Sequence, residues 1–264
     1  MLWQSDCVIS FSERIRFAMR YALRHLGISV VVGFVFAFFV FWLIYPAPYR
    51  SMLGVDSIFF IILLVDVACG PLLTLILVSP AKTPRERWLD FGLVGLIQIA
   101  ALCYGMSSLW MARPVALIFE VDRLVVVTAN EIDTAELAVA PAKMNKLPLW
   151  GVMKGGTRSP KDSDELFASL NNEIAGISPA MRPSWWVAWD QQMTEILARA
   201  KPLSELISRR PEQVELLLNV VKTSGLAVNQ LFYLPLTSSK QKDWVVLFDI
   251  SLRFVGYAPV DGFN

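Results

Sequence analysis

The sequence predicts an α+β fold class: three transmembrane helices followed by an α+β domain with an antiparallel sheet. The chain of 264 residues is 55% hydrophobic and only 18% charged, whereas roughly a quarter of the residues in a soluble domain are charged. The apolar excess lies before residue 113, in three runs that each approach the ~20 residues of a spanning helix. The remaining ~150 residues have the composition of a globular domain with its own core.

The three predicted spans are Gly27–Tyr45, Ile58–Val78 and Leu89–Ala112. The first run is too long for the apolar region of a signal peptide, and it ends in Tyr45-Pro46-Ala47-Pro48 rather than in a small-x-small cleavage pattern. We therefore expect a retained signal anchor.

The distribution of basic residues predicts the orientation of the spans. Four arginines precede the first span and three basic residues separate the second from the third, whereas the Pro46–Ser57 loop contains only Arg50. Positive charge marks cytoplasmic segments. We therefore expect a multi-pass membrane protein, with residues 1–26 a cytoplasmic basic amphipathic segment on the membrane lipids and 27–112 the three-helix transmembrane region. The domain of residues 113–264 is expected on the opposite face, which in a Gram-negative cell is the periplasm.

Strand and helix patterns alternate in the predicted domain. Val115–Val121 and Leu124–Thr128 are β-branched runs that predict a hairpin. Further expected strands and helices follow the usual start and stop signals. They are a short helix capped by Asn130, a strand Leu147–Lys154 ended by Gly155-Gly156, amphipathic helices from Ser159 to Ile174 and from Pro183, two shorter helices after Pro202 and Pro211, and strands Leu231–Leu236, Trp244–Ile250 and Arg253–Ala258.

Several function classes are excluded by composition. The net charge of +1 gives no sign of a nucleic-acid partner. His25 is the single histidine, so a histidine-based metal site or a Ser/His triad is not expected. The Gly155-Gly156 pair lacks the Lys-Ser/Thr of a phosphate-binding loop. We expect no metal and no cofactor.

Long motifs at both ends of the chain carry a resemblance to a known family. They are SERIRFAMRYALRHLGISV, YPAPYR, VDVACGPLLTLILVSPAK, ARPVALIFEVDRLVVVTANEID and KDWVVLFDISLRFVGYAPVDGF. Together they resemble the TfpX/TfpZ-like type IV pilin accessory proteins, whereas the similarity is thinner between Ala140 and Ser224. The first ten residues depart from the pattern and suggest an upstream start, with the family-like beginning near Phe11.

The resemblance implies a non-enzymatic inner-membrane assembly factor or chaperone that assists assembly, stability or surface display of a type IV pilin. Its implied partners are the major pilin and inner-membrane components of pilus assembly, contacted in the bilayer and in the periplasm. An alternative is a membrane-bound enzyme that modifies the pilin, for example by glycan or phosphoglycerol transfer. A cleft with converging acids and arginines of perturbed pKa would favour this alternative.

Asp66, inside the second span, is the first candidate for a special site because a carboxylate near the bilayer centre costs about 2.5 kcal/mol or more. If the second and third spans are antiparallel, Tyr104 lies level with Asp66 and Gln98 about one turn deeper. We expect Asp66 to bond the Tyr104 hydroxyl. The pair would be either a structural latch within the chain or a docking point for the helix of the pilin.

Two further features are open to more than one interpretation. Gly70-Pro71 predicts a kink, either for packing alone or with a freed carbonyl near Val67 that joins the polar site. Trp185, Trp186 and Trp189 open a predicted helix and would belong to the core, touch the membrane surface or form a contact patch for a partner. Beside the hairpin turn, Glu120, Asp122 and Arg123 are expected to form a surface ion-pair cluster.

Overall fold

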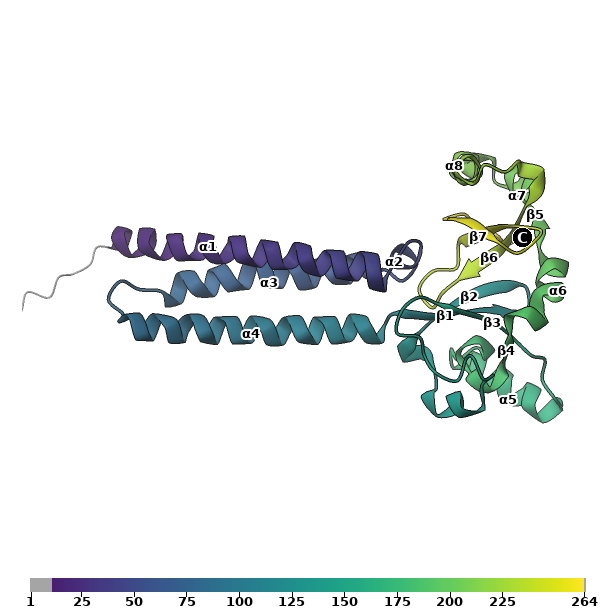
Figure 1. Cartoon of the computed structure of the whole chain (residues 1–264), viewed down its shortest axis with the longest axis horizontal. Coiled ribbons are helices and arrows are strands. Elements are labelled where there is room, and N and C mark those ends of the chain that lie inside the picture. Colours follow the sequence, from purple (N-terminus) through teal and green to yellow (C-terminus); the bar gives the residue numbers. More distant parts are fainter. Residues whose placement is uncertain (1–10, 264) are drawn as a thin grey trace, which may run out of the picture. The chain divides into compact units, whose positions relative to one another are not determined.

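A computed structural model describes residues 11–263 of the chain, as three long helices and a mixed α/β domain (Figure 1). Two compact units can be distinguished. The first contains residues 11–43 and 56–110, and the second contains residues 44–55 and 111–263. The predicted fold class, three apolar helices followed by an α+β domain with a sheet, is confirmed. The predicted features of residues 1–10 lie outside the described part of the chain.

The first unit consists of three helices that are long and apolar enough to cross a bilayer, so the chain is a membrane protein. Helix α1 runs from Phe11 to Phe38 and continues as the π-helical segment η1, Phe39–Ile44. Helices α3 and α4 span Val55–Leu77 and Pro84–Met111. Pro71 lies inside α3, which stays helical through it.

Small residues mark the contacts between these helices. A Cβ on Gly33 of α1 would collide with Leu63 of α3, and one on Gly105 of α4 would press against Ile62 at 3.1 Å. Large apolar side chains such as Phe34 and Trp42 point outward instead. This pattern is typical of helices in lipid, where close backbone approach rather than hydrophobic burial holds helices together.

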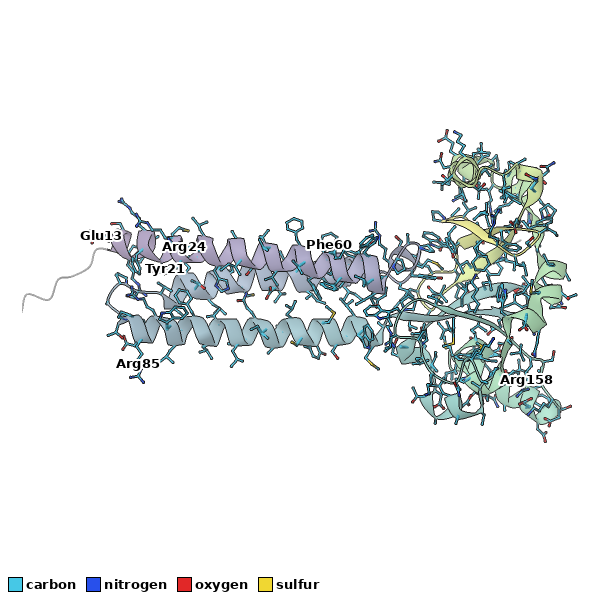
Figure 2. The ribbon with its side chains drawn as sticks, viewed as in Figure 1. Glu13, Tyr21, Arg24, Phe60, Arg85 and Arg158 are labelled. Carbon is cyan, nitrogen blue, oxygen red and sulfur yellow. The ribbon has the colours of Figure 1, made fainter. Side chains whose placement is uncertain are left out.

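Basic residues gather at one end of the helical unit, as the labelled Arg24 and Arg85 show (Figure 2). There Arg87 lies over the ring of Phe17, with 5.5 Å from guanidinium carbon to ring centroid. The rings of Tyr21 and Phe91 are also 5.5 Å apart. The first turns of α4 therefore pack against the basic half of α1, which is a continuous extension of the first span.

The second unit is built on one eight-stranded sheet of order β4-β3-β1-β2-β6-β7-β8, with β5 paired to β6. The strands are β1 Pro114–Glu120, β2 Arg123–Thr128, β3 Met153–Thr157, β4 Trp186–Ala188, β5 Lys201–Pro202, β6 Leu231–Thr237, β7 Trp244–Asp249 and β8 Phe254–Ala258. The helices are α2 Tyr49–Met52, α5 Ser163–Ile174, α6 Trp189–Arg199, α7 Leu203–Arg209 and α8 Val214–Ser224.

The sheet is mixed, which corrects the prediction of an antiparallel one. The hairpin β1–β2 and the β6–β7–β8 meander are antiparallel as expected. However, β1 pairs with β3 and β2 pairs with β6 in parallel. The reason is the long connections between these strands, which let the chain cross over and return in the same direction.

Two apolar clusters cover the sheet. One gathers around Ile118, Val127 and Trp186 at the β1–β2 hairpin. The other packs α7 and α8 onto the β6–β7–β8 meander, with Leu217 and Leu247 fully buried. Helix α8 ends at Gly225, whose φ of 69° is the left-handed conformation that glycine adopts readily.

The loop that joins α1 to α3 belongs to the second unit. The Ser238 hydroxyl donates to the Met52 carbonyl at 3.0 Å, and the rings of Tyr49 and Tyr257 lie 6.5 Å apart. Residues 44–55 therefore fold with the domain, although the sequence placed them in the three-helix region.

Three local predictions in the domain are wrong. The segment after β2 forms two 3-10 helices, η2 Ala129–Glu131 and η3 Thr134–Val139, and Asp133 rather than Asn130 caps the second. Strand β3 contains Gly155 and Gly156 instead of ending before them, because both glycines pair with β1 and β4. Met144 and Gln192 pack where their Cβ atoms would stand. The predicted helix from Pro183 begins only at Trp189, because the preceding residues pair with β3 as the edge strand β4.

Candidate functional site

A polar cluster joins all three helices of the first unit. His25 of α1 places Nδ1 at 2.6 Å from the Thr74 hydroxyl of α3 and Nε2 at 2.6 Å from the Gln98 amide oxygen of α4. The Thr74 hydroxyl donates to the Gly70 carbonyl at 2.9 Å, and the Gln98 amide nitrogen donates to the Asp66 carbonyl at 3.1 Å. One histidine thus connects two helices through both of its ring nitrogens.

The hydrogen bonds of this cluster are oriented by Thr74 and Gln98. The Thr74 hydroxyl and the Gln98 amide nitrogen donate to the backbone carbonyls of Gly70 and Asp66, so the oxygens of Thr74 and Gln98 face the two ring nitrogens of His25. A single imidazole therefore contacts one oxygen of α3 and one of α4.

The structure brings together three of the predicted site residues, Asp66, Gly70 and Gln98. Gly70 is required because a Cβ there would collide with the Gln98 amide. Oδ1 of Asp66 is buried and has no hydrogen-bond partner among the residues that the structure describes.

Tyr104 is not part of the cluster, so the expected bond between Asp66 and Tyr104 is wrong. The predicted depth was close, because the level contacts Ile62–Gly105 and Gly70–Gln98 lie within about three residues of the predicted register. The direction predicted for the Tyr104 side chain, towards Asp66, was wrong. Tyr104 lies about 100° around α4 from Gly105, and its side chain is 77% exposed.

Two residues of the cluster, His25 and Thr74, were missed by sequence reasoning. The first span was taken to begin at Gly27, so His25 was placed just outside the bilayer. The same antiparallel counting applied to α1 and α3 would have brought the pair close: Gly33 meets Leu63, and His25 meets Thr74 about two turns further along α1 and three along α3.

The three tryptophans singled out in the sequence lie in or beside the core of the domain. Trp185 and Trp186 are buried, and the Trp186 indole donates to the Ala180 carbonyl at 2.8 Å. Trp189 begins α6 and packs edge-on against Phe254 at 5.9 Å. Trp185 and Trp189 do not share a helix face, because Trp185 precedes the helix.

A polar cleft of about 530 Å³ opens between α5 and α6, at the ends of the parallel strands β1 and β3. Glu120 lies at its base and accepts a hydrogen bond of 2.7 Å from the Ala180 amide. Burial raises the pKa of the Glu120 carboxyl. Arg158, on the wall of the cleft, binds both carboxylate oxygens of Glu165 at 2.7 and 2.8 Å and stacks on Trp185 at 4.7 Å.

The prediction that Glu120 belongs to a surface ion-pair cluster is therefore wrong. The expected turn ion pair exists between Arg123 and Asp122 at 2.8 Å, but Glu120 points into the fold. Carboxyl ends of parallel strands are where α/β sheets commonly bind ligands, so the cleft is a second candidate site. Within residues 11–263 no group of three or more His, Cys, Asp or Glu side chains is placed to hold a metal ion.

These features define a membrane-embedded helical unit that carries a mixed α/β domain. A family model described as fimbrial assembly protein FimB matches residues 13–54. The chain is 32% identical over 253 residues to the fimbrial assembly protein of serogroup E1 of Dichelobacter nodosus, over 96% of this chain and 98% of that protein, and equally to that of serogroup I. The protein of serogroups C1 and C2 is 39% identical over 128 residues, 48% of this chain and 98% of that protein.

The chain therefore belongs to the FimB family of fimbrial assembly proteins. No solved structure shows a significant match.

Proposed function

We propose that this protein assists the assembly, stability or surface display of fimbriae built from a type IV pilin, without itself being an enzyme. The observation that carries the proposal is the similarity to fimbrial assembly proteins along 96% of the chain, through both the helical unit and the domain. The finer resemblance to TfpX/TfpZ-like accessory proteins agrees with this role and is part of the proposal.

We place the protein in the bacterial inner membrane with the domain in the periplasm. The basic residues at one end of the helices support a cytoplasmic location for that end (Figure 2). The shared fold of residues 44–55 and 111–263 supports a location of both segments on the opposite side. A pilin with one membrane helix and one extramembrane head could then be contacted in both compartments.

Within the membrane, the cluster of His25, Thr74 and Gln98 acts first as a latch between α1, α3 and α4. Hydrogen bonds between membrane helices contribute about 0.6–1.7 kcal/mol each, so three helices joined through one imidazole form a defined unit. The unpaired Oδ1 of Asp66 supports docking of a pilin helix as the second role.

The function is tested by deleting the gene and restoring it on a plasmid. We expect sheared surface fimbriae to fall at least several-fold in the deletion strain and to return on complementation, with pilin transcription unchanged. Normal amounts of surface fimbriae in the deletion strain would refute the proposal.

The substitution Asp66→Asn distinguishes a role of Asp66 in packing the three helices from a role in docking the pilin. Cys69→Ser, on the exposed side of the same helix, is the control. Docking through Asp66 predicts normal protein levels with reduced fimbriation for Asp66→Asn alone. If fimbriation stays normal at normal protein levels, Asp66 serves packing and not docking.

The enzymatic alternative is favoured by one observation, the cleft that Glu120, with its raised pKa, lines together with Arg158 and Glu173. Acids and arginines that converge in a cleft are the arrangement that group transfer to a pilin would need. Intact-mass measurement of the pilin from cells with Glu120→Gln decides the point, because only an enzyme would leave a pilin lighter by the transferred group.

A further inference from the structure

Helix α5 turns its apolar side away from the domain. Its stripe consists of Leu166, Phe167, Leu170 and Ile174, which are 44%, 63%, 45% and 86% exposed. These positions share one helix face, and Ser169 is the buried residue of the helix. Contiguous exposed apolar side chains of this kind mark interaction surfaces.

The polar side of α5 holds the helix in place. Arg158 clamps Glu165 with two hydrogen bonds, and the Asp162 carboxylate caps the helix by accepting from the Glu165 amide at 2.7 Å. Arg158 is in turn stacked on the buried Trp185. The stripe is therefore presented on a supported helix, whereas α8 of the same domain buries its apolar face through Leu217.

The stripe continues into the polar cleft. Leu166 belongs to the stripe and also lines the cleft. Val121, an exposed valine with a φ of 58° at the turn after Glu120, lines the cleft beside it. A β-branched residue rarely adopts a positive φ, so the turn is held in a strained form at the rim. An extended or helical segment lying on the stripe would thus reach the cleft with its next side chains.

The charges around the stripe select the kind of partner. Asp162, Asp164 and Glu173 lie along it, whereas Glu165 is already paired with Arg158. Helix α5 itself contains no basic residue, and Lys161 precedes it. An anionic membrane surface would favour lysine and arginine here. A second copy of this chain would bring two acidic helices together, which like charges oppose.

We propose that the α5 stripe binds an apolar segment, flanked by basic residues, of the extramembrane head of the fimbrial subunit. This inference rests on the proposed function. It adds the surface and the chemistry of contact: apolar side chains of the partner on the stripe and basic side chains beside Asp162, Asp164 and Glu173, as in helix-in-groove recognition.

The contact is tested by photo-crosslinking in cells that make fimbriae, with the full-length chain in its membrane. Benzoylphenylalanine replaces Phe167 in one variant and Leu216 of α8, which is 42% exposed, in the control. We expect an adduct with the fimbrial subunit, recognised by its antibody, at position 167 and at least several-fold less at 216. An adduct with a second copy, with lipid only, or with neither, or equal subunit adducts at both positions, would overturn the inference.

A charge test sharpens the result. Asp164→Lys is expected to reduce the subunit adduct at position 167 several-fold, and unchanged adduct would remove the basic flank from the proposal. The double variant Phe167→Ser/Ile174→Ser should lower fimbriation, with Leu216→Ser as its matched control. If gene deletion leaves fimbriae normal, the proposed function fails; if deletion removes them while the double variant is normal and no adduct forms, this inference alone fails.

Discussion

The two units of this protein differ in the side chains that they expose. In the helical unit the buried positions include small and polar residues such as Ala22 and Thr74 beside a few large ones such as Phe59, and many large apolar side chains point outward. In the domain the buried positions are large and apolar, such as Tyr233 and Phe248. The difference follows from the solvent, because lipid accepts an apolar surface and water does not.

Helix α5 is the exception in the domain, because its apolar side chains point outward as they do in the helical unit. Its polar side is bound to the fold and its apolar side is open. Lipid explains such a face in α1 or α3. In the domain the same face calls for a protein partner, which is the basis of the inference drawn from it.

The largest expected effect breaks the apolar core of the domain. Leu247→Ala removes a fully buried side chain between the sheet and α8, and should destabilise the domain by about 2–5 kcal/mol. Thermal unfolding of the full chain in detergent measures the loss. The control Leu216→Ala should shift stability by about 0.5 kcal/mol or less, and equal losses in both variants would contradict the core assignment.

The next effect concerns the close approach of α3 and α4. Gly70→Ala would push the Gln98 amide away from the Asp66 carbonyl, at a cost of about 1–3 kcal/mol. Gly95→Ala in α4 is the matched control, because nothing lies within 4 Å of a Cβ there. Helical ellipticity during heating should show a lower midpoint for Gly70→Ala only, and a lower midpoint for both would argue against a specific contact.

A smaller effect tests the latch itself. His25→Leu and Gln98→Leu, alone and together, form a double-mutant cycle across the 2.6 Å contact between the two side chains. We expect a coupling energy of about 0.6–1.7 kcal/mol. Additive losses of stability would mean that the imidazole and the amide do not depend on each other.

The smallest effect is a pH dependence in the domain. Burial raises the folded-state pKa of Glu120 above its ordinary value of 4.5, so the folded state holds this proton more tightly than the unfolded state. Stability is therefore greatest below pH 4.5 for this group and falls as the pH rises through the raised pKa. Glu120→Gln, which can still accept from the Ala180 amide, should raise the unfolding midpoint at pH 7 and remove this slope. A variant with the wild-type slope would place the titrating group elsewhere.

Elements with strong local signals could be predicted from the sequence. The β1–β2 hairpin and the strands β6, β7 and β8 were found with nearly correct bounds, because alternation and turn residues act between neighbours. Strand β4 was mistaken for helix because its pairing with β3 lies about 30 residues away along the chain. The parallel pairs were missed for the same reason.

The candidate sites show a similar division. Asp66 was found because a carboxylate in an apolar run is conspicuous, and Gln98 because it lies at nearly the same depth. His25 was not assigned, since its partner Thr74 is distant in sequence and its own neighbours are basic. Glu120 was taken for a surface residue, because nothing local indicates that Ala180 closes over it.

By itself, the sequence determined the three membrane helices, the α+β class and the amphipathic face of α5, since bilayer thickness and helical periodicity act over a few turns of chain. Only the tertiary structure decided that His25 joins three helices, that Glu120 is buried, that residues 44–55 belong to the domain and that the apolar face of α5 is left open. The physical reason is that a pattern shows which side chains share a face, whereas what covers that face depends on segments far away in the chain.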